Sequence, residues 1–200
     1  MATASQSSSA AVTARSRPGN GAQLGVLLSV AAGVMFVSTL IGAYFSVRNW
    51  VGVDSGGFIP DGLKFDNYAG FMTMTSSLLA AFAAEWALVS ARLRNRRWAA
   101  AGYGLCVLFF VGALNAVWHI GQRSQLAVAD TSYAILFYAL LAAMVLSLVA
   151  GVIAAVVNMI RVLADHVWGD DLLLGRAGNW VIHFAALTAT VGFFLIYTYK

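Results

Sequence analysis

Three histidines are the first candidates for chemistry in this chain, because imidazole binds metals and transfers protons near neutral pH. His119 ends an apolar stretch, His166 lies in the segment ADHVWGDD, and His183 lies inside a later apolar stretch. A redox metal such as haem iron or copper needs His, Met, Cys or carboxylate ligands that face one another. If the apolar stretches cross a membrane, the three histidines fall at different depths or on different sides. We therefore assign no catalytic, cofactor-binding or metal-binding residue to this chain.

His183 is still the most informative of the three, because a polar ring within a membrane span is costly without a partner. We interpret it as a neutral ring bonded to a Ser, a Thr or a backbone carbonyl of a neighbouring helix, in preference to a catalytic group. Glu85 lies near the end of its apolar stretch, so we expect it to extend toward the arginines of RLRNRRW. Asn115 and Asn158 are expected to form hydrogen bonds between helices.

The segment NWVGVDSGGFIPDGLKFDNY carries three acids, Asp54, Asp61 and Asp66, which suggest either a cation site or solvated turns. We favour turns, since an oxygen-ligand site needs a convergence that spacing alone does not supply. A third possibility is that the aromatic residues of this segment pack on a partner subunit. The single cysteine, Cys106, lies in an apolar run, which excludes a disulfide within the chain and indicates a packing role.

The composition identifies the environment in which these residues act. The 200 residues are 60% hydrophobic and only 10% charged, with a mean hydropathy of +0.79. Soluble domains carry about 25% charged residues, so this chain is predicted to be an integral membrane protein. The net charge of +4 does not indicate nucleic-acid binding, because orientation in a bilayer accounts for the arginines better.

Five segments are long and apolar enough to cross a bilayer, which requires about 20 residues as a helix. They run over residues 24–47, 68–91, 98–120, 132–160 and 177–199. Period-two alternation, the signature of a membrane barrel, is absent from the sequence. The predicted fold is an all-α integral membrane bundle of five helices, spanning residues 24–200.

Residues 1–23 are rich in Ala, Ser and Thr and contain no acid, which is also typical of a mitochondrial transit peptide. We favour a flexible cytoplasmic tail of a bacterial protein, since no amphipathic face carrying arginine is evident. With the N-terminus inside, the inner segments hold eight of the Lys and Arg residues and the outer segments four. The positive-inside rule therefore predicts an inside N-terminus and an outside C-terminus, in the plasma membrane of a bacterium.

Several short sequence motifs occur in an order and spacing typical of one family. They are Met35–Phe36, Tyr44–Phe45–Ser46–Val47–Arg48, Ser76–Ser77, Arg96–Arg97–Trp98, Phe109–Phe110–Val111, Phe137–Tyr138, Gly151, His183–Phe184 and Ile196–Tyr197. On the basis of these motifs, the chain from about residue 24 resembles subunit III of haem–copper (cytochrome c) oxidases, in the short five-helix bacterial form.

The chain also departs from the family at its buried polar positions. Gly33 stands in place of a buried Glu that the family links to proton-uptake support, and Val117 in place of a Glu of the third helix. Met144 and Ser147 replace a His-x-x-His pair, and Ala186 replaces the Asp that follows His-Phe. Because each buried ionisable group is costly without partners, we expect that the internal polar network was lost as a unit.

The resemblance implies a non-catalytic accessory subunit that holds no cofactor of its own. It would pack on catalytic subunits that carry haem and copper, and it would bind membrane phospholipids. Arg48, Trp50 and His183 are the candidate lipid or subunit contacts.

Two alternatives stay open. One keeps the fold and changes the partner, to a nitric oxide reductase or another membrane oxygenase. The other is a stand-alone channel or transporter, which would need a polar path through spans that offer few polar side chains.

Overall fold

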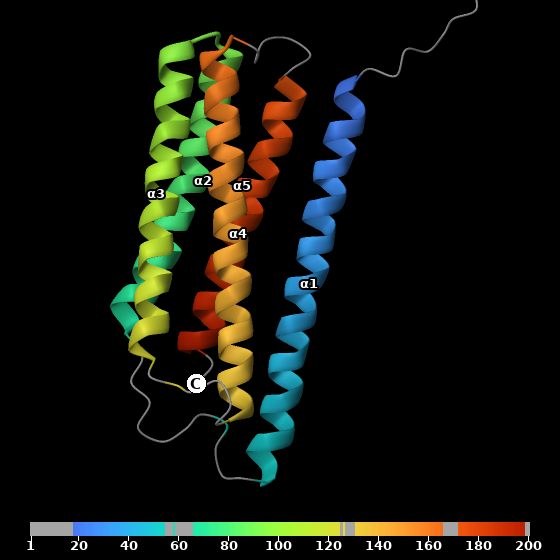
Figure 1. Cartoon of the computed structure of the whole chain (residues 1–200), viewed down its shortest axis with the longest axis vertical. Coiled ribbons are helices and arrows are strands. Elements are labelled where there is room, and N and C mark those ends of the chain that lie inside the picture. The colour runs from blue at the N-terminus through green and yellow to red at the C-terminus, as the bar shows by residue number, and fades with distance from the viewer. Residues whose placement is uncertain are drawn as a thin grey trace, which may run out of the picture.

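The computed structural model describes residues 18–54, 58, 66–124, 126, 131–165 and 172–198, and all regular structure in these ranges is helical. The elements are α1 (Pro18–Asp54), α2 (Asn67–Arg92), α3 (Arg96–Arg123), α4 (Ser132–Leu163), α5 (Leu172–Phe193) and the short π-helical segment η2 (Phe194–Thr198) that continues α5. Figure 1 shows the five helices running side by side, with α1 at the edge of the bundle. The predicted all-α fold is confirmed.

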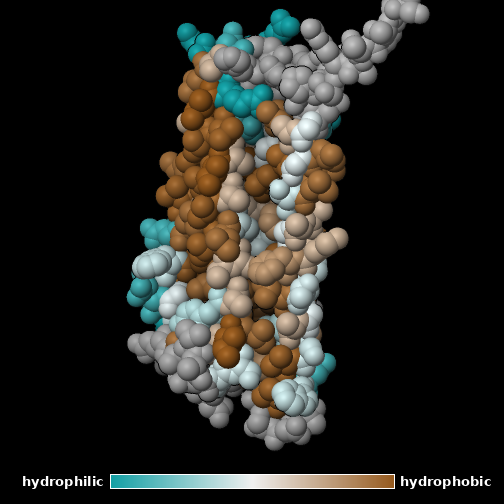
Figure 2. Space-filling model, turned by 45° about the vertical axis from the view of Figure 1, so that its right-hand side comes forward, coloured by the Kyte–Doolittle hydropathy of each residue, from teal (hydrophilic) through white to brown (hydrophobic). Residues whose placement is uncertain are grey.

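Each of the five helices forms an apolar span of at least 26 residues, with η2 included in the span of α5. At 1.5 Å per residue, such a span exceeds the hydrocarbon thickness of about 30 Å. In Figure 2, hydrophobic side chains cover the middle of the molecule and hydrophilic ones gather toward its ends. The chain therefore has the architecture of a multi-pass membrane protein.

The helix ends differ from the predicted spans most on α1, α4 and α5. Helix α1 runs from Pro18 to Asp54, so it begins before and ends after the predicted span of residues 24–47. A proline is well suited to the first position of a helix because its fixed φ and missing N–H cost nothing there. Helix α4 continues to Leu163, and α5 begins at Leu172 where the prediction began at residue 177.

One end of the bundle is strongly cationic, and we call it the arginine end. The described residues that define it are Arg92, Arg94, Arg96, Arg97, Arg161 and Arg176. The turn from α2 to α3 is closed there by Asn95, whose side chain accepts a hydrogen bond from the Trp98 N–H at 3.4 Å. The Arg96 guanidinium donates to the Leu163 carbonyl, which ties this turn to the end of α4.

Small residues set the close packing of α2 on α3. The buried small side chains are Ala80, Ala83, Ala84, Ala87 and Ala91 on α2, and Ala99, Cys106 and Ala113 on α3. At Gly102, an added Cβ would lie 2.8 Å from Ala87 Cβ and 3.1 Å from the Ala83 carbonyl oxygen. In lipid, helices associate through such close contact, because water exclusion supplies no force between them.

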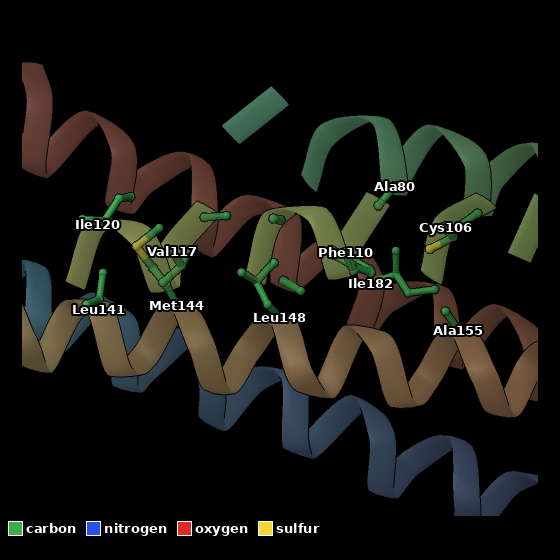
Figure 3. Packing of buried hydrophobic residues seen from close by; sticks show 14 of the residues in the cluster. Ala80, Cys106, Phe110, Val117, Ile120, Leu141, Met144, Leu148, Ala155 and Ile182 are labelled. Carbon is green, nitrogen blue, oxygen red and sulfur yellow. The ribbon is translucent and has the colours of Figure 1, made fainter. Parts of the chain in front are cut away.

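Larger side chains fill the centre of the bundle formed by α2–α5. Phe110 of α3 and Ile182 of α5 meet there in Figure 3, and both are fully buried. Gly151 of α4 leaves the space that the Phe110 ring uses, since an added Cβ would lie 2.9 Å from that ring.

Helix α1 is attached to this bundle through few contacts. Among its side chains in residues 21–51, only Val37 and Tyr44 are buried. Tyr44 donates a hydrogen bond to the Leu195 carbonyl at 3.2 Å. Nearer the N-terminus, Gly33 lies against the ring of Phe184, and an added Cβ would be 2.7 Å from Phe184 Cζ. Gly33 therefore permits the close approach of α1 to α5.

We predict that Gly102→Leu lowers the free energy of unfolding by about 1–3 kcal/mol, because the new side chain overpacks the α2–α3 contact. Thermal unfolding in mild detergent, followed by circular dichroism, measures this. Gly112→Leu on the same helix is the matched control, since no atom lies within 4 Å of its added Cβ. Equal melting temperatures for the two variants would contradict the packing account.

We predict that Gly33→Leu separates α1 from α5, whereas Gly42→Leu leaves the helices in place because its added Cβ meets no atom within 4 Å. Nitroxide labels at Leu28→Cys and Leu187→Cys, both exposed positions, report the distance by pulsed EPR in a Cys106→Ala background. The expected result is a longer and broader distance distribution for Gly33→Leu alone. Identical distributions would show that Gly33 does not control the α1 contact.

Candidate functional site

His183 lies in the middle part of α5, and its ring is oriented by the helix to which it belongs. Nδ1 lies 2.7 Å from the backbone carbonyl oxygen of Asn179, one turn earlier. A carbonyl oxygen only accepts hydrogen bonds, so Nδ1 carries the hydrogen and Nε2 faces outward from this contact. The predicted backbone-carbonyl partner is thus present, but it belongs to α5 itself and not to a neighbouring helix.

Glu85 of α2 meets the other ring nitrogen of His183. Nε2 lies 3.6 Å from Glu85 Oε1, and the two side chains are 46% and 50% exposed. The prediction that Glu85 extends toward the arginine loop is wrong, because α5 brings a polar partner closer. The sequence of α2 alone does not show which helix lies beside Glu85.

Asn179 holds this pair together and is itself 1% exposed. Its Nδ2 donates to Glu85 Oε1 at 3.2 Å and to the Ala84 carbonyl at 3.0 Å. Its Oδ1 accepts the hydroxyl hydrogen of Tyr103 at 3.1 Å. One amide on α5 therefore connects α2 and α3, so the bundle contains an internal polar network at positions other than those where the chain departs from the family. We refer to Tyr103, Asn179, Glu85 and His183 as the polar cluster.

The contact of His183 with Asn179 decides which ring nitrogen faces Glu85. With Nδ1–H bonded to the Asn179 carbonyl, the Nε2 atom is the one that lies 3.6 Å from Glu85 Oε1. The imidazole and the carboxyl group are therefore held beside each other by two adjacent helices.

The polar cluster lies inside the apolar spans, away from the ends of α2 and α5. Glu85 precedes the end of α2 at Arg92 by seven residues, and His183 follows the start of α5 at Leu172 by eleven. These separations correspond to about 10 Å and 16 Å along the helices. Polar groups at such depths are uncommon and mark functional positions by default.

The exposed atoms of this arrangement can accept a hydrogen bond from a neighbouring molecule. Within the described ranges, no group of three or more His, Cys, Asp or Glu side chains is placed to hold a metal ion. The two exposed functional groups are therefore one carboxyl and one imidazole, held beside each other on α2 and α5.

The structure does not bring Arg48, Trp50 and His183 into one site. Phe184 is level with Gly33 on α1, and Arg48 follows Gly33 by fifteen residues, about 22 Å along the helix. Arg48 is half-buried, and Trp50 is 75% exposed near the end of α1. The two residues suit the membrane interface at the end opposite the arginine end, whereas His183 lies deeper and nearer the arginine end.

The other candidate residues serve local structure. Asp66 caps α2 by accepting from the Ala69 N–H at 3.3 Å, and it pairs with Arg123 of α3 at 3.1 Å. This agrees with the turn interpretation of Asp66. Asp61, His166 and the side chain of Asp54 lie outside the described residues.

The two predicted bridging amides behave differently. Asn158 of α4 donates to the Gly175 carbonyl of α5 at 3.2 Å, so its prediction is confirmed. Asn115 is exposed on α3, in a groove of about 420 Å³ between α2 and α3 that also contains His119 and Arg123. A second groove of about 570 Å³ lies between α3 and α4 and is almost entirely apolar. Both grooves are near the end opposite the arginine end and are separate from the polar cluster.

Asn179 and Tyr103 complete the cluster, but the sequence analysis does not predict either of them as a site residue. The spacing of Asn179 and His183 does indicate a connection, because residues four apart share one face of a helix. Tyr103 offered no comparable signal, because a tyrosine in an apolar span is ordinary. Its partner becomes evident only when α3 packs beside α5.

The fold and the cluster define a multi-pass helical membrane protein with a cluster of polar side chains inside its apolar spans. Comparison with known protein families gave no matching family model, and no curated protein matches the chain.

We predict that Asn179→Leu, which keeps the branching of the side chain and removes its polar atoms, lowers the free energy of unfolding by about 1–3 kcal/mol, because Tyr103 and Glu85 lose a buried partner. Thermal unfolding in mild detergent measures the change. The exposed Asn115→Leu is the control and should have little effect.

A double-mutant cycle tests whether the loss comes from the hydrogen bond itself. Tyr103→Phe should destabilise the wild-type chain by about 1 kcal/mol and have almost no further effect in the Asn179→Leu background. Fully additive effects would show that the Tyr103–Asn179 bond does not contribute to stability.

Proposed function

We propose that this chain is a non-catalytic, subunit III-like component of a membrane respiratory haem–copper oxidase in the plasma membrane of a bacterium. It packs on the catalytic subunit, which carries the haem and copper, and it binds phospholipid along its apolar surface. Its contribution is to the assembly and stability of the complex, without an active site of its own.

The observation that carries this proposal is the half-exposed Glu85–His183 pair at membrane depth. In an isolated chain, this pair would face hydrocarbon, which solvates neither group. A neighbouring subunit removes that cost. The family resemblance identifies the kind of neighbour, since subunit III packs on haem-bearing subunits in that family.

The weak attachment of α1 supports the same role. Most of its described side chains are exposed, including Met35 at 71%. Lipid or a neighbouring subunit can cover such a helix, and both occupants belong to the proposed complex.

The described charges support an orientation with the N-terminus inside. The arginine end holds six described arginines, whereas the opposite end holds Arg48 and Arg123. By the positive-inside rule, the arginine end faces the cytoplasm. The N-terminal end of α1 then lies on the cytoplasmic side and the C-terminal end of α5 on the outer side.

The test is affinity purification of the tagged full chain from native membranes in mild detergent, with an optical spectrum of the eluate. We predict that haem-bearing subunits co-purify and that the spectrum contains the bands of a haem–copper oxidase. Bands of haem b alone together with nitric oxide reductase activity would favour the alternative partner. A monomer without haem would contradict the proposal, and ion or solute flux in liposomes containing only this chain would favour a channel or transporter.

A further inference from the structure

We infer that the α2–α5 face around Glu85 and His183 docks a transmembrane helix of the partner subunit, and that this helix presents a hydrogen-bond-donating side chain at the depth of Glu85. The inference rests on the proposed function, because it names the surface through which the chain meets its partner.

The first step is an incomplete set of hydrogen bonds. Glu85 Oε1 accepts from Asn179 Nδ2 and lies beside His183 Nε2. Within the described part of the chain, no donor reaches Glu85 Oε2. A carboxyl group has acceptor sites on both oxygens, so half of this group is left for a donor from outside.

The second step concerns the cost of leaving that acceptor in lipid. Glu85 is half-exposed about 10 Å from the end of α2. Acyl chains offer no hydrogen-bond donor, and water is scarce at this depth. Neighbouring residues hold the carboxyl group in place, because Asn179 is buried and bonded on both sides of its amide. The group is therefore fixed for recognition at one depth.

The third step is the surface around the pair. Phe82 and Val89 lie one turn before and one turn after Glu85 on α2, and Leu187 lies one turn after His183 on α5. All three are exposed, Phe82 at 73%. In a membrane, helices associate through close apolar packing and through polar side chains that hydrogen-bond across the contact, and this face offers both features.

The need of Glu85 Oε2 for a hydrogen-bond donor decides which kind of molecule fits this face. A phospholipid headgroup would have to leave the interface to reach Glu85. A second copy of this chain would bring two carboxyl groups of the same kind together across a two-fold axis, without a new donor. A helix of another subunit carrying Ser, Thr, Asn, Gln, Trp or Arg supplies the donor and covers the apolar rim.

The opposite side of the bundle provides the comparison. Leu108 on α3 and Ile153 on α4 are exposed at 64% and 58%. Both lie in stretches where the neighbouring exposed side chains are apolar, so lipid satisfies that side without a partner.

The test is site-specific photo-cross-linking of the full chain in native membranes, followed by purification of the complex. The photoreactive residue p-benzoylphenylalanine is placed at Phe82 or Leu187, with Leu108 and Ile153 as matched controls. We expect cross-links to a haem-bearing subunit from the first two positions and not from the controls. Cross-links to that subunit from the controls alone would overturn the inference, and so would dimers of this chain or lipid adducts alone at Phe82 and Leu187.

A second measurement isolates the carboxyl group. Glu85→Ala should reduce the yield of co-purified haem-bearing subunit about three- to tenfold, the effect of one hydrogen bond within a membrane, whereas Glu85→Gln should keep most of it because an acceptor oxygen remains. Leu108→Ala is the control for truncation of an exposed side chain. Equal yields for Ala and Gln at residue 85, in chains with equal melting temperatures, would overturn the role of Glu85.

These outcomes separate the inference from the proposed function. If haem-bearing subunits co-purify but cross-link through the α3–α4 side, only the docking face is wrong. If Phe82 and Leu187 cross-link to a membrane protein without haem, the oxidase assignment is wrong and the docking face stands.

Discussion

The structure depends on the need to satisfy polar groups where no water is present, and Asn179 is where that need is met most fully. This buried amide accepts from Tyr103 of α3 and donates to Glu85 and the Ala84 carbonyl of α2. Its own carbonyl orients His183. Three helices are therefore fixed in register by one residue, and the exposed pair inherits its geometry from a buried group. Small residues at the helix contacts make this possible, because they let the backbones approach closely enough for short side chains to meet.

The fold was largely predictable from the sequence, because long apolar runs in a bilayer have only the helix available to them. Helix ends were less accessible: the leucines at 172–174 extend α5 beyond the expected start. Most of the site was not predictable for a different reason. The hydropathy of one helix shows neither how the helix is rotated about its axis nor which helices lie beside it. For this reason Glu85 was expected near the arginines, whereas the structure places it beside His183. His183 was identified as a candidate, whereas Asn179 and Tyr103 gain meaning only through packing.

The surroundings of Gly33 follow from the two adjacent α5 residues His183 and Phe184, which contact different helices. His183 and Phe184 are adjacent in sequence and therefore about 100° apart around the helix. His183 turns to Glu85 on α2, while the Phe184 ring lies against Gly33 on α1. The ring occupies the space that a side chain at residue 33 would need. An acid at this position would have to displace the ring and would find an apolar neighbour in place of a polar one.

The different attachment of α1 and α2 to the bundle also bears on the position of the Glu85 carboxyl group, which lies on α2. Helix α1 meets α5 and η2 through the Phe184 ring against Gly33 and through the hydrogen bond from Tyr44 to the Leu195 carbonyl, and most of its described side chains are exposed. Helices α2, α3 and α5 are held by small-residue packing and by Asn179, which restricts their relative movement. The docking that we infer for the Glu85 carboxyl group at one depth requires a rigid support. The α2–α5 face provides that support, and the peripheral α1 is free to adapt to the lipid or subunit that covers it.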